Sequence, residues 1–248
     1  MSGRNRWRAF LTLTYMNGVI PIRRQPLYLV NLLASPLAFL FFIYIASHMT
    51  LLGYAIGGGM LLTVLSIGTS LQADLSHYRH DMKLQDLVVA SPVEAWVYVT
   101  GMAFSEFVYS IPGMAVFAVL WVETGHATAL GAVSLVGVLL LVWAFASALG
   151  FTLATFFSDV RETFAFSPLI SLGLTVLPPV YYPVSYLPGW VQPVAYLSPT
   201  TYAADLLHGI VGVASPSLES QLIDWAVLIG FTIGLLLLAS WKARWREP

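Results

Sequence analysis

The residues of this chain that could do chemistry are few, and they interrupt otherwise apolar stretches of sequence. Glu106 lies in the middle of an apolar run at residues 103–109. A charged segment begins at residue 74, and a second, shorter one holds Asp159 and Arg161. A carboxylate inside an apolar run suits gating or cation handling, whereas charged segments between such runs suit docking to a partner.

Motifs for catalysis are absent from the sequence. The chain has no cysteine, no G-x-S-x-G nucleophile turn, no H-E-x-x-H metal-ligand pair and no G-x-x-x-x-G-K-[ST] phosphate loop. His48, Glu123 and His126 are scattered, without the spacing of metal ligands. We therefore predict that the chain is not an enzyme and holds no metal or cofactor of its own.

Glu106 allows two interpretations. A carboxylate at bilayer depth costs about 2.5–3.5 kcal/mol on insertion scales, so its side chain must face other helices or be protonated. One interpretation is a gating or cation-linked role, and the other is a structural hydrogen bond to a serine or tyrosine of a neighbouring helix. Because Glu106 is a single acid with no basic partner in any predicted span, the sequence gives little support to a proton relay.

The composition places these residues in a membrane protein. Of 248 residues, 58% are hydrophobic and 9% are charged, and the mean hydropathy is +0.79. Soluble domains carry about 25% charged residues, and a soluble fold of this size could not bury so much apolar surface. The partner we expect from composition is the lipid bilayer, and we expect no nucleic acid.

Six stretches are long and apolar enough to cross a bilayer as helices, which takes about 20 residues each. The sequence therefore predicts an all-α integral membrane protein, a single transmembrane domain over residues 1–248. All eleven Lys and Arg residues fall before span one, between spans two and three, between spans four and five, or after span six. The positive-inside rule places these segments, with both termini, on the cytoplasmic side of a plasma (inner) membrane. The six spans are residues 28–47, 51–73, 96–120, 129–157, 164–181 and 223–241.

Two segments on the predicted cytoplasmic side have patterns of their own. In residues 1–26, apolar side chains recur at helical spacing among arginines, which predicts a helix lying in the membrane interface, with a frayed basic tail as the alternative. Residues 74–94 are charged but carry a short apolar stripe, which suits either a docking helix or a plain solvated turn. The N-terminal apolar set is Trp7, Phe10, Leu11 and Tyr15, and the stripe is Met82, Leu84, Leu87 and Val88.

Residues 178–220, on the opposite side, are too rich in proline for one helix and too apolar for an ordinary loop. Non-helical backbone at membrane depth survives only when it is buried in protein or lines a cavity. We therefore predict short re-entrant or interfacial helices near residues 188–196 and 200–211. The residues that mark this region are Pro183, Pro188, Gly189, Trp190, Pro199 and Tyr202.

Three features resemble the membrane subunits of type-two ATP-binding-cassette (ABC) exporters, which export drugs, lipids, polysaccharides and ions. The first is the amphipathic helix before span one, and the second is the segment between spans two and three that ends Leu87-Val-Val-Ala-Ser-Pro92. The third is Tyr182-Pro-Val-Ser-Tyr-Leu-Pro-Gly-Trp190, followed by Leu197-Ser-Pro-Thr-Thr-Tyr-Ala-Ala-Asp205. The chain departs from the family where its coupling segment has Asp81-Met-Lys-Leu84 in place of Gly-Thr-Leu-Glu.

The resemblance, which covers nearly the whole chain, implies partners and a mechanism. Two copies of the chain, or one copy and a close relative, would form the pore, and each would dock on a separate cytosolic ATPase that holds ATP and Mg²⁺. Residues 74–94 would serve as the coupling helix, and the short connection after span four would add a minor contact. The coupling residues implied are Arg79, His80, Asp81, Lys83, Leu84, Asp86, Asp159 and Arg161.

Spans two and five would then form the walls of the substrate path. Their mostly apolar character favours an amphipathic or hydrophobic cargo, such as a drug, a lipid or a lipid-linked glycan, exported by alternating access. A membrane scaffold that moves nothing shares the hydropathy but needs no docking segment, and an intramembrane enzyme lacks its motifs. The residues predicted to line the path are Met60, which could equally pack between helices, Thr63, Ser66, Glu106, Ser171 and Thr175.

Overall fold

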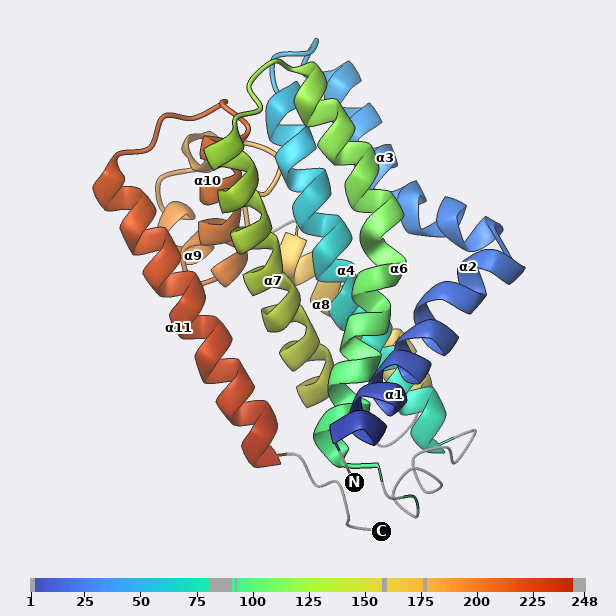
Figure 1. The fold of residues 1–248 in the computed structure, drawn as a ribbon. Helices are drawn as coiled ribbons and strands as arrows, with labels where there is room; N and C mark the ends of the chain where they lie inside the picture. The colour runs from blue at the N-terminus through green and yellow to red at the C-terminus, as the bar shows by residue number, and fades with distance from the viewer. Residues whose placement is uncertain (1–2, 81–90, 92, 158–159, 176–177, 243–248) are drawn as a thin grey trace.

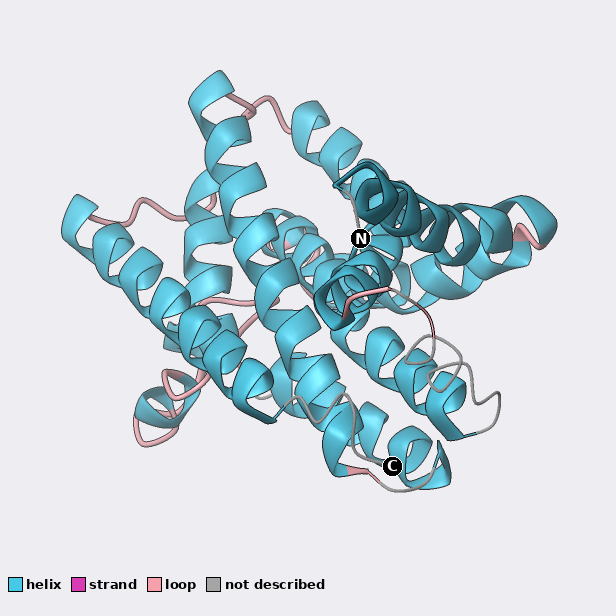
Figure 2. Ribbon diagram, turned by 60° about the horizontal axis from the view of Figure 1, so that its bottom comes forward, coloured by secondary structure: helices cyan, strands magenta, loops and turns pink. Residues whose placement is uncertain are grey.

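The fold is helical throughout the part of the chain that the structure describes. The computed structural model describes residues 3–80, 91, 93–157, 160–175 and 178–242 (Figure 1). Every regular element within these ranges is a helix, and turns connect them (Figure 2). The predicted all-α fold is therefore confirmed for these residues.

Four helices are long and apolar enough to cross a membrane. They correspond to the second, third, fourth and sixth predicted spans: α6 and α11 extend beyond the predicted stretch at both ends, α4 begins one residue later and ends seven later, and α7 ends one residue earlier. At 1.5 Å per residue, a helix of 25 residues or more exceeds the roughly 30 Å of a bilayer core. The four helices are α4 (Leu52–His80), α6 (Ala95–Glu123), α7 (Ala129–Phe156) and α11 (Leu218–Lys242).

The other two predicted spans are less regular, and each contains a proline. Helix α3 (Leu27–Ala46) matches the first predicted span and has Pro36 inside it. Helix α8 (Val160–Thr175) has 16 residues with Pro168 inside, so the predicted helix 164–181 begins earlier and ends earlier than expected. Residues 178–181 are turns and bends, because Pro178 and Pro179 cannot continue a helix. Six spans stay a prediction, and four of the six correspond to helices that are long and apolar enough to cross a membrane.

Helix α4 forms the centre of the bundle. It packs against α3, α6, α7 and α8. In its most apolar 18 residues, 72% are buried, compared with 22% for α11 at the edge of the bundle (Figure 1). At the crossing with α7, a Cβ atom on Gly68 would lie 2.5 Å from the carbonyl oxygen of Ala146, and one on Gly150 would overlap the carbonyl oxygen of Gly68. The two backbones touch here, as small residues allow in membrane bundles.

The N-terminal segment is one bent helical arm that packs against α6. Phe10 meets Phe104 of α6 with ring centroids 5.4 Å apart, whereas Trp7, Leu11 and Tyr15 are mostly exposed. The arm is helical, as predicted, and its exposed apolar face suits the interfacial location that the sequence predicts. The arm comprises α1 (Gly3–Thr14), the π-helical turn η1 (Tyr15–Val19) and α2 (Ile20–Arg24).

The proline-rich region at residues 178–220 folds into short helices, as predicted. The longest, α10, packs against α11, α7 and α4 on one side of the bundle (Figure 1). Gly58 of α4 allows this region to approach, because a Cβ atom there would lie 2.7 Å from the carbonyl oxygen of Val180. The elements are η2 (Val184–Tyr186), α9 (Gln192–Ala195) and α10 (Pro199–Ile210).

The helix ends sort into two groups along the bundle. The beginning of α1, the end of α4, the beginning of α6 and the end of α11 lie at one end (Figure 1). The connections α3–α4 and α6–α7 lie at the other end (Figure 1). This grouping agrees with the distribution of basic residues, while the side of the membrane that each group faces stays a prediction.

Candidate functional site

The segment predicted to dock a cytosolic partner is carried by the ends of two long helices. Helix α4 continues to His80, so residues 74–80 of the predicted loop 74–94 are helical and the connection is shorter than expected. Arg79 lies in the last turn of α4, and Arg161 lies exposed in the first turn of α8. The predicted coupling residues Asp81, Lys83, Leu84, Asp86 and Asp159 lie outside the described residues, as does the side chain of His80.

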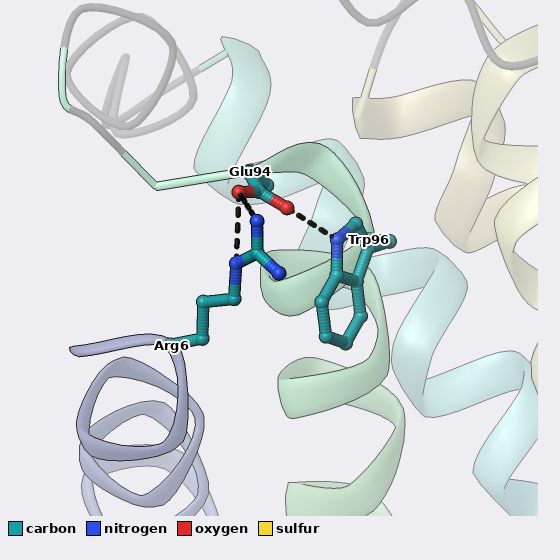
Figure 3. Close-up of polar contacts among 3 residues, drawn as sticks. All are labelled: Arg6, Glu94 and Trp96. Carbon is teal, nitrogen blue, oxygen red and sulfur yellow. Dashed lines mark hydrogen bonds and ion pairs between the residues drawn. The ribbon is translucent and has the colours of Figure 1, made fainter. Parts of the chain in front are cut away.

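An ion pair joins the N-terminal arm to the point where this segment enters α6. The Nε and Nη2 atoms of Arg6 donate to Oε1 of Glu94 at 2.9 and 2.6 Å, and the indole N–H of Trp96 donates to Oε2 at 2.7 Å (Figure 3). The Trp96 hydrogen bond and the Arg6 guanidinium hold the pKa of Glu94 below its usual value, although partial burial opposes them. The Glu94 carboxylate is therefore charged at neutral pH and can keep its ion pair with Arg6, and we call this ion pair the latch.

Glycines let the arm and α6 lie in backbone contact. A Cβ atom on Gly18, in η1, would lie 2.7 Å from the carbonyl oxygen of Ser105, and one on Gly101 would lie 3.2 Å from the side chain of Leu13. The π-helical turn that brings Gly18 to α6 is a rare geometry and is frequent at functional sites. The arm, the latch and α6 thus form one packed unit next to the docking segment. In the sequence, the one indication of this packing is Asn17-Gly18, which interrupts an apolar run.

In the part of the chain that the structure describes, the residues predicted to line a substrate path lie in different surroundings: the packed core, a small space between helices and a larger cavity. Met60 and Thr63 are fully buried in the core around α4. Ser171 and Thr175 border a space of about 10 Å³ between α4, α7 and α8, which holds no more than a water molecule. The hydroxyls of Thr63, Ser66 and Thr175 donate to carbonyl oxygens of their own helices, those of Gly59, Thr63 and Ser171. The substrate path stays a prediction.

Glu106 is not a single acid, contrary to the sequence analysis. Asp74 of α4 lies beside it, and the two carboxyl groups are hydrogen-bonded to each other. Glu106 is 6% exposed, and both side chains border a cavity of about 360 Å³ between the N-terminal arm, α4 and α6. The sequence analysis places Asp74 in a loop after the second predicted span, and therefore does not predict the pair. The remaining lining residues are Asn17, Pro21, Ser70, Tyr78 and Tyr109.

In the proline-rich region, the prolines lie at the beginnings of the short helices or in the turns before them. Pro183 precedes η2, and Pro199 is the first residue of α10, where a missing N–H is tolerated. Pro188 and Gly189 lie in the turn before α9, next to Trp190, which is 81% exposed. The hydroxyl of Tyr202 donates to the carbonyl oxygen of Tyr196 at 2.9 Å and ties α10 to the segment before it.

Two titratable side chains in α10 are held in the neutral or partly neutral state by burial. His208 is buried and lies 3.1 Å from the carbonyl oxygen of Val180, and its burial lowers its pKa to about 4. Burial, together with repulsion from Asp224, raises the pKa of Asp205 to about 6, although a hydrogen bond from the Tyr196 hydroxyl opposes the shift. Asp205 therefore titrates well above the usual range of an aspartate.

We expect Asp205→Asn to stabilise the chain at pH 7. Because the folded state binds the Asp205 proton more tightly than the unfolded state, this side chain destabilises the fold as pH rises from about 4 to about 6, by up to about 3 kcal/mol. Apparent Tm of the detergent-purified chain, measured from pH 4 to 7, should fall less steeply in the variant. If Tm changed with pH equally in the variant and the parent chain, burial of Asp205 would not be what raises its pKa.

Comparison with known families agrees with this arrangement of helices. The family profile for the ABC-2 type transporter membrane region matches residues 9–211, from the N-terminal arm to the end of α10. The comparison with curated proteins gave no match. Because the profile covers most of the 248 residues, the chain belongs to the ABC-2 type transporter family, as a non-catalytic membrane permease subunit.

Proposed function

We propose that this permease works with a cytosolic ABC ATPase to export an amphipathic or hydrophobic substrate, such as a drug, a lipid or a lipid-linked glycan, by alternating access. Membership of the family implies ATP-driven export, and the match over residues 9–211 is the observation that carries the proposal. ATP and Mg²⁺ would bind in the partner, since the sequence has no phosphate-binding loop.

The path of α4 supports a role in coupling. It extends from next to the docking segment, through the core, to the proline-rich region, where Gly58 contacts Val180. Residues 81–94, together with the end of α4, would receive the movement of the ATPase, and α4 would carry it across the bundle. Because α4 is packed against helices on most of its surface, its displacement would move its neighbours as well.

A second permease copy and a second ATPase would complete the assembly. Helix α8 packs against α4 and leaves several apolar side chains exposed along 16 residues. A helix shorter than the bilayer core and packed on one side is better stabilised with another protein surface beside it. We expect this surface to belong to an identical chain or to a close relative. The exposed side chains are Phe164, Phe166, Leu169 and Leu172.

Two other functions predict different partners. A membrane scaffold would bind a partner without stimulating ATP hydrolysis, and an intramembrane enzyme would act without an ATPase. Neither needs a charged segment with an apolar stripe between the end of α4 and the beginning of α6. We expect the permease to lie in the plasma (inner) membrane, with its termini in the cytoplasm, as the distribution of basic residues predicts.

The test is affinity purification of the tagged chain from native membranes in mild detergent, followed by mass spectrometry. We expect an ABC ATPase to copurify at about one copy per permease, and a variant with Arg79 and Lys83 changed to glutamate to retain much less of it. A stoichiometric partner of another kind, with no ATPase in several detergents or after cross-linking in membranes, would refute the proposal.

A further inference from the structure

The cavity between the N-terminal arm, α4 and α6 has a polar lining that the export mechanism leaves unexplained. Its volume of about 360 Å³ is within the range of small-molecule sites and is far larger than one metal ion needs. It lies next to the end of the bundle that holds the docking segment, since Asp74 lies within two turns of the end of α4. A hollow of this size beside a carboxyl pair, of which Glu106 is buried, indicates room for a ligand.

The lining is fixed by hydrogen bonds outside the carboxyl pair. The Asn17 amide donates to the carbonyl oxygen of Leu13 at 3.1 Å and contacts the Met102 sulfur at 3.4 Å. Its oxygen accepts the hydroxyl of Tyr78 at 2.9 Å. The arm, α4 and α6 therefore hold the Tyr78 ring in one place at the cavity wall, and a preformed site of this kind loses little entropy on binding.

The charge of the pair selects the charge of the ligand. Two carboxyl groups can hydrogen-bond to each other only if at least one of them carries a proton, and with one proton between them the pair has one net negative charge. Among the residues that the structure describes, the cavity lining has no Lys, Arg or His to neutralise it, and His77 lies exposed on the same helix outside the lining. One positive charge in the cavity would balance the site, whereas an anion would be repelled.

The lining also distinguishes an organic cation from a metal ion. Among the described residues, no group of three His, Cys, Asp or Glu side chains is placed to hold a metal ion. A primary ammonium needs hydrogen-bond acceptors, which the carboxyl pair and the hydroxyl of Ser70 can supply at the wall. The rings of Tyr78 and Tyr109 border the same space and can stabilise a cation attached to an apolar group.

We propose that this cavity binds the primary ammonium group of an organic monocation. The site is formed by the hydrogen-bonded pair Asp74 and Glu106, with Tyr78 and Tyr109 beside it. Binding itself does not depend on export. That the bound cation is cargo, so that the substrates include amine-bearing amphiphiles, rests on the proposed function.

The test is isothermal titration calorimetry of the full chain in phosphatidylcholine nanodiscs at pH 8, where imidazole groups are neutral. The probes are benzylammonium, its neutral isostere benzyl alcohol, and sodium chloride. We expect one saturable benzylammonium site per chain, no saturable site for the alcohol, and little competition by sodium. Saturable binding of the alcohol, or sodium that competes as well as the amine, would overturn the proposal.

Variants separate the charge of the pair from its shape. Glu106→Gln leaves Asp74 ionised beside a neutral partner, so it should bind benzylammonium within about threefold of the parent chain, whereas Asp74→Asn combined with Glu106→Gln should weaken binding at least about tenfold. Ser70→Leu should weaken binding at least about tenfold, because it removes the hydroxyl acceptor and narrows the cavity without any change of charge. Asp205→Asn, an acid-to-amide change in the proline-rich region, is the matched control and should bind as the parent does.

Loss of the ammonium site and failure of the proposed export function can be told apart, because benzylammonium binding and ATPase copurification are both measured on folded protein. Each variant is compared by size-exclusion profile, and Ser70→Leu tests the site even if the double variant does not fold. Equal binding by Ser70→Leu or by a folded double variant would refute the ammonium site. If binding follows the variants but no ATPase copurifies, the site stands and the proposed export function fails.

Discussion

Replacing Gly150 with alanine should force α7 away from α4 and destabilise the bundle by about 1–3 kcal/mol. A Cβ atom at this position would overlap the carbonyl oxygen of Gly68, and backbone atoms cannot move aside as a flexible side chain can. The only adjustment is a separation of the two helices, which loses dispersion contacts along their whole crossing. The measurement is the apparent Tm of the purified chain in detergent, read by fluorescence-detected size exclusion.

Gly234→Ala provides the matched control. Gly234 lies inside a long helix as Gly150 does, but a Cβ atom there would meet nothing within 4 Å. Since alanine has the higher helix propensity, this variant should be neutral or slightly more stable. If Gly150→Ala were as stable as Gly234→Ala, the close approach of α4 and α7 would be wrong.

Reversing the charge of Arg79 and Lys83 should uncouple the ATPase from transport. Both residues lie in the segment that we propose docks the ATPase, Arg79 in the last turn of α4 and Lys83 four residues later in the sequence. If Arg79 and Lys83 face acidic groups of the ATPase, their replacement by glutamate places like charges opposite each other, which weakens docking. We therefore expect permease-stimulated ATP hydrolysis to fall at least about tenfold. The measurement is ATPase activity of the reconstituted complex, alongside membrane insertion of the variant.

Arg4→Glu with Arg8→Glu is the control for this pair. It makes the same change in charge on exposed residues of α1, at the same end of the bundle. This variant should retain stimulated hydrolysis if the effect is specific to the docking segment. Retained substrate-stimulated turnover in the Arg79 and Lys83 variant would contradict the coupling assignment, and equal losses in both variants would reduce it to an effect of net charge.

The long helices could be predicted from the sequence because length and apolar content alone define them. Mostly apolar runs of about 20 or more residues predicted α4, α6, α7 and α11 close to their places in the structure. The prediction was less accurate for the fifth stretch, because hydropathy does not register that consecutive prolines lack the N–H donors a helix needs. Pro168 lies inside α8, and the helix ends before Pro178, so the fifth stretch is shorter than its hydropathy implied.

The candidate site was harder to predict because it depends on helix register. Asp74 and Glu106 are far apart in the sequence, and only the packing of α4 on α6 brings them together. Thr63 and Ser66 were predicted to line a substrate path, but their hydroxyls donate hydrogen bonds to carbonyl oxygens of α4 itself. Such bonds are common for hydroxyl side chains in helices and leave a sequence pattern that looks like a polar path.

The burial of α4 on most of its surface has a consequence for how the chain can change. A helix that faces lipid accepts almost any apolar residue of sufficient size, whereas one surrounded by protein must also match its neighbours in shape. A saturation mutagenesis scan scored by surface expression should therefore show α4 as the least tolerant helix and α11 as the most tolerant. Sequence drift within this protein should accumulate on α11, while substitutions in α4 should require compensating changes in α7.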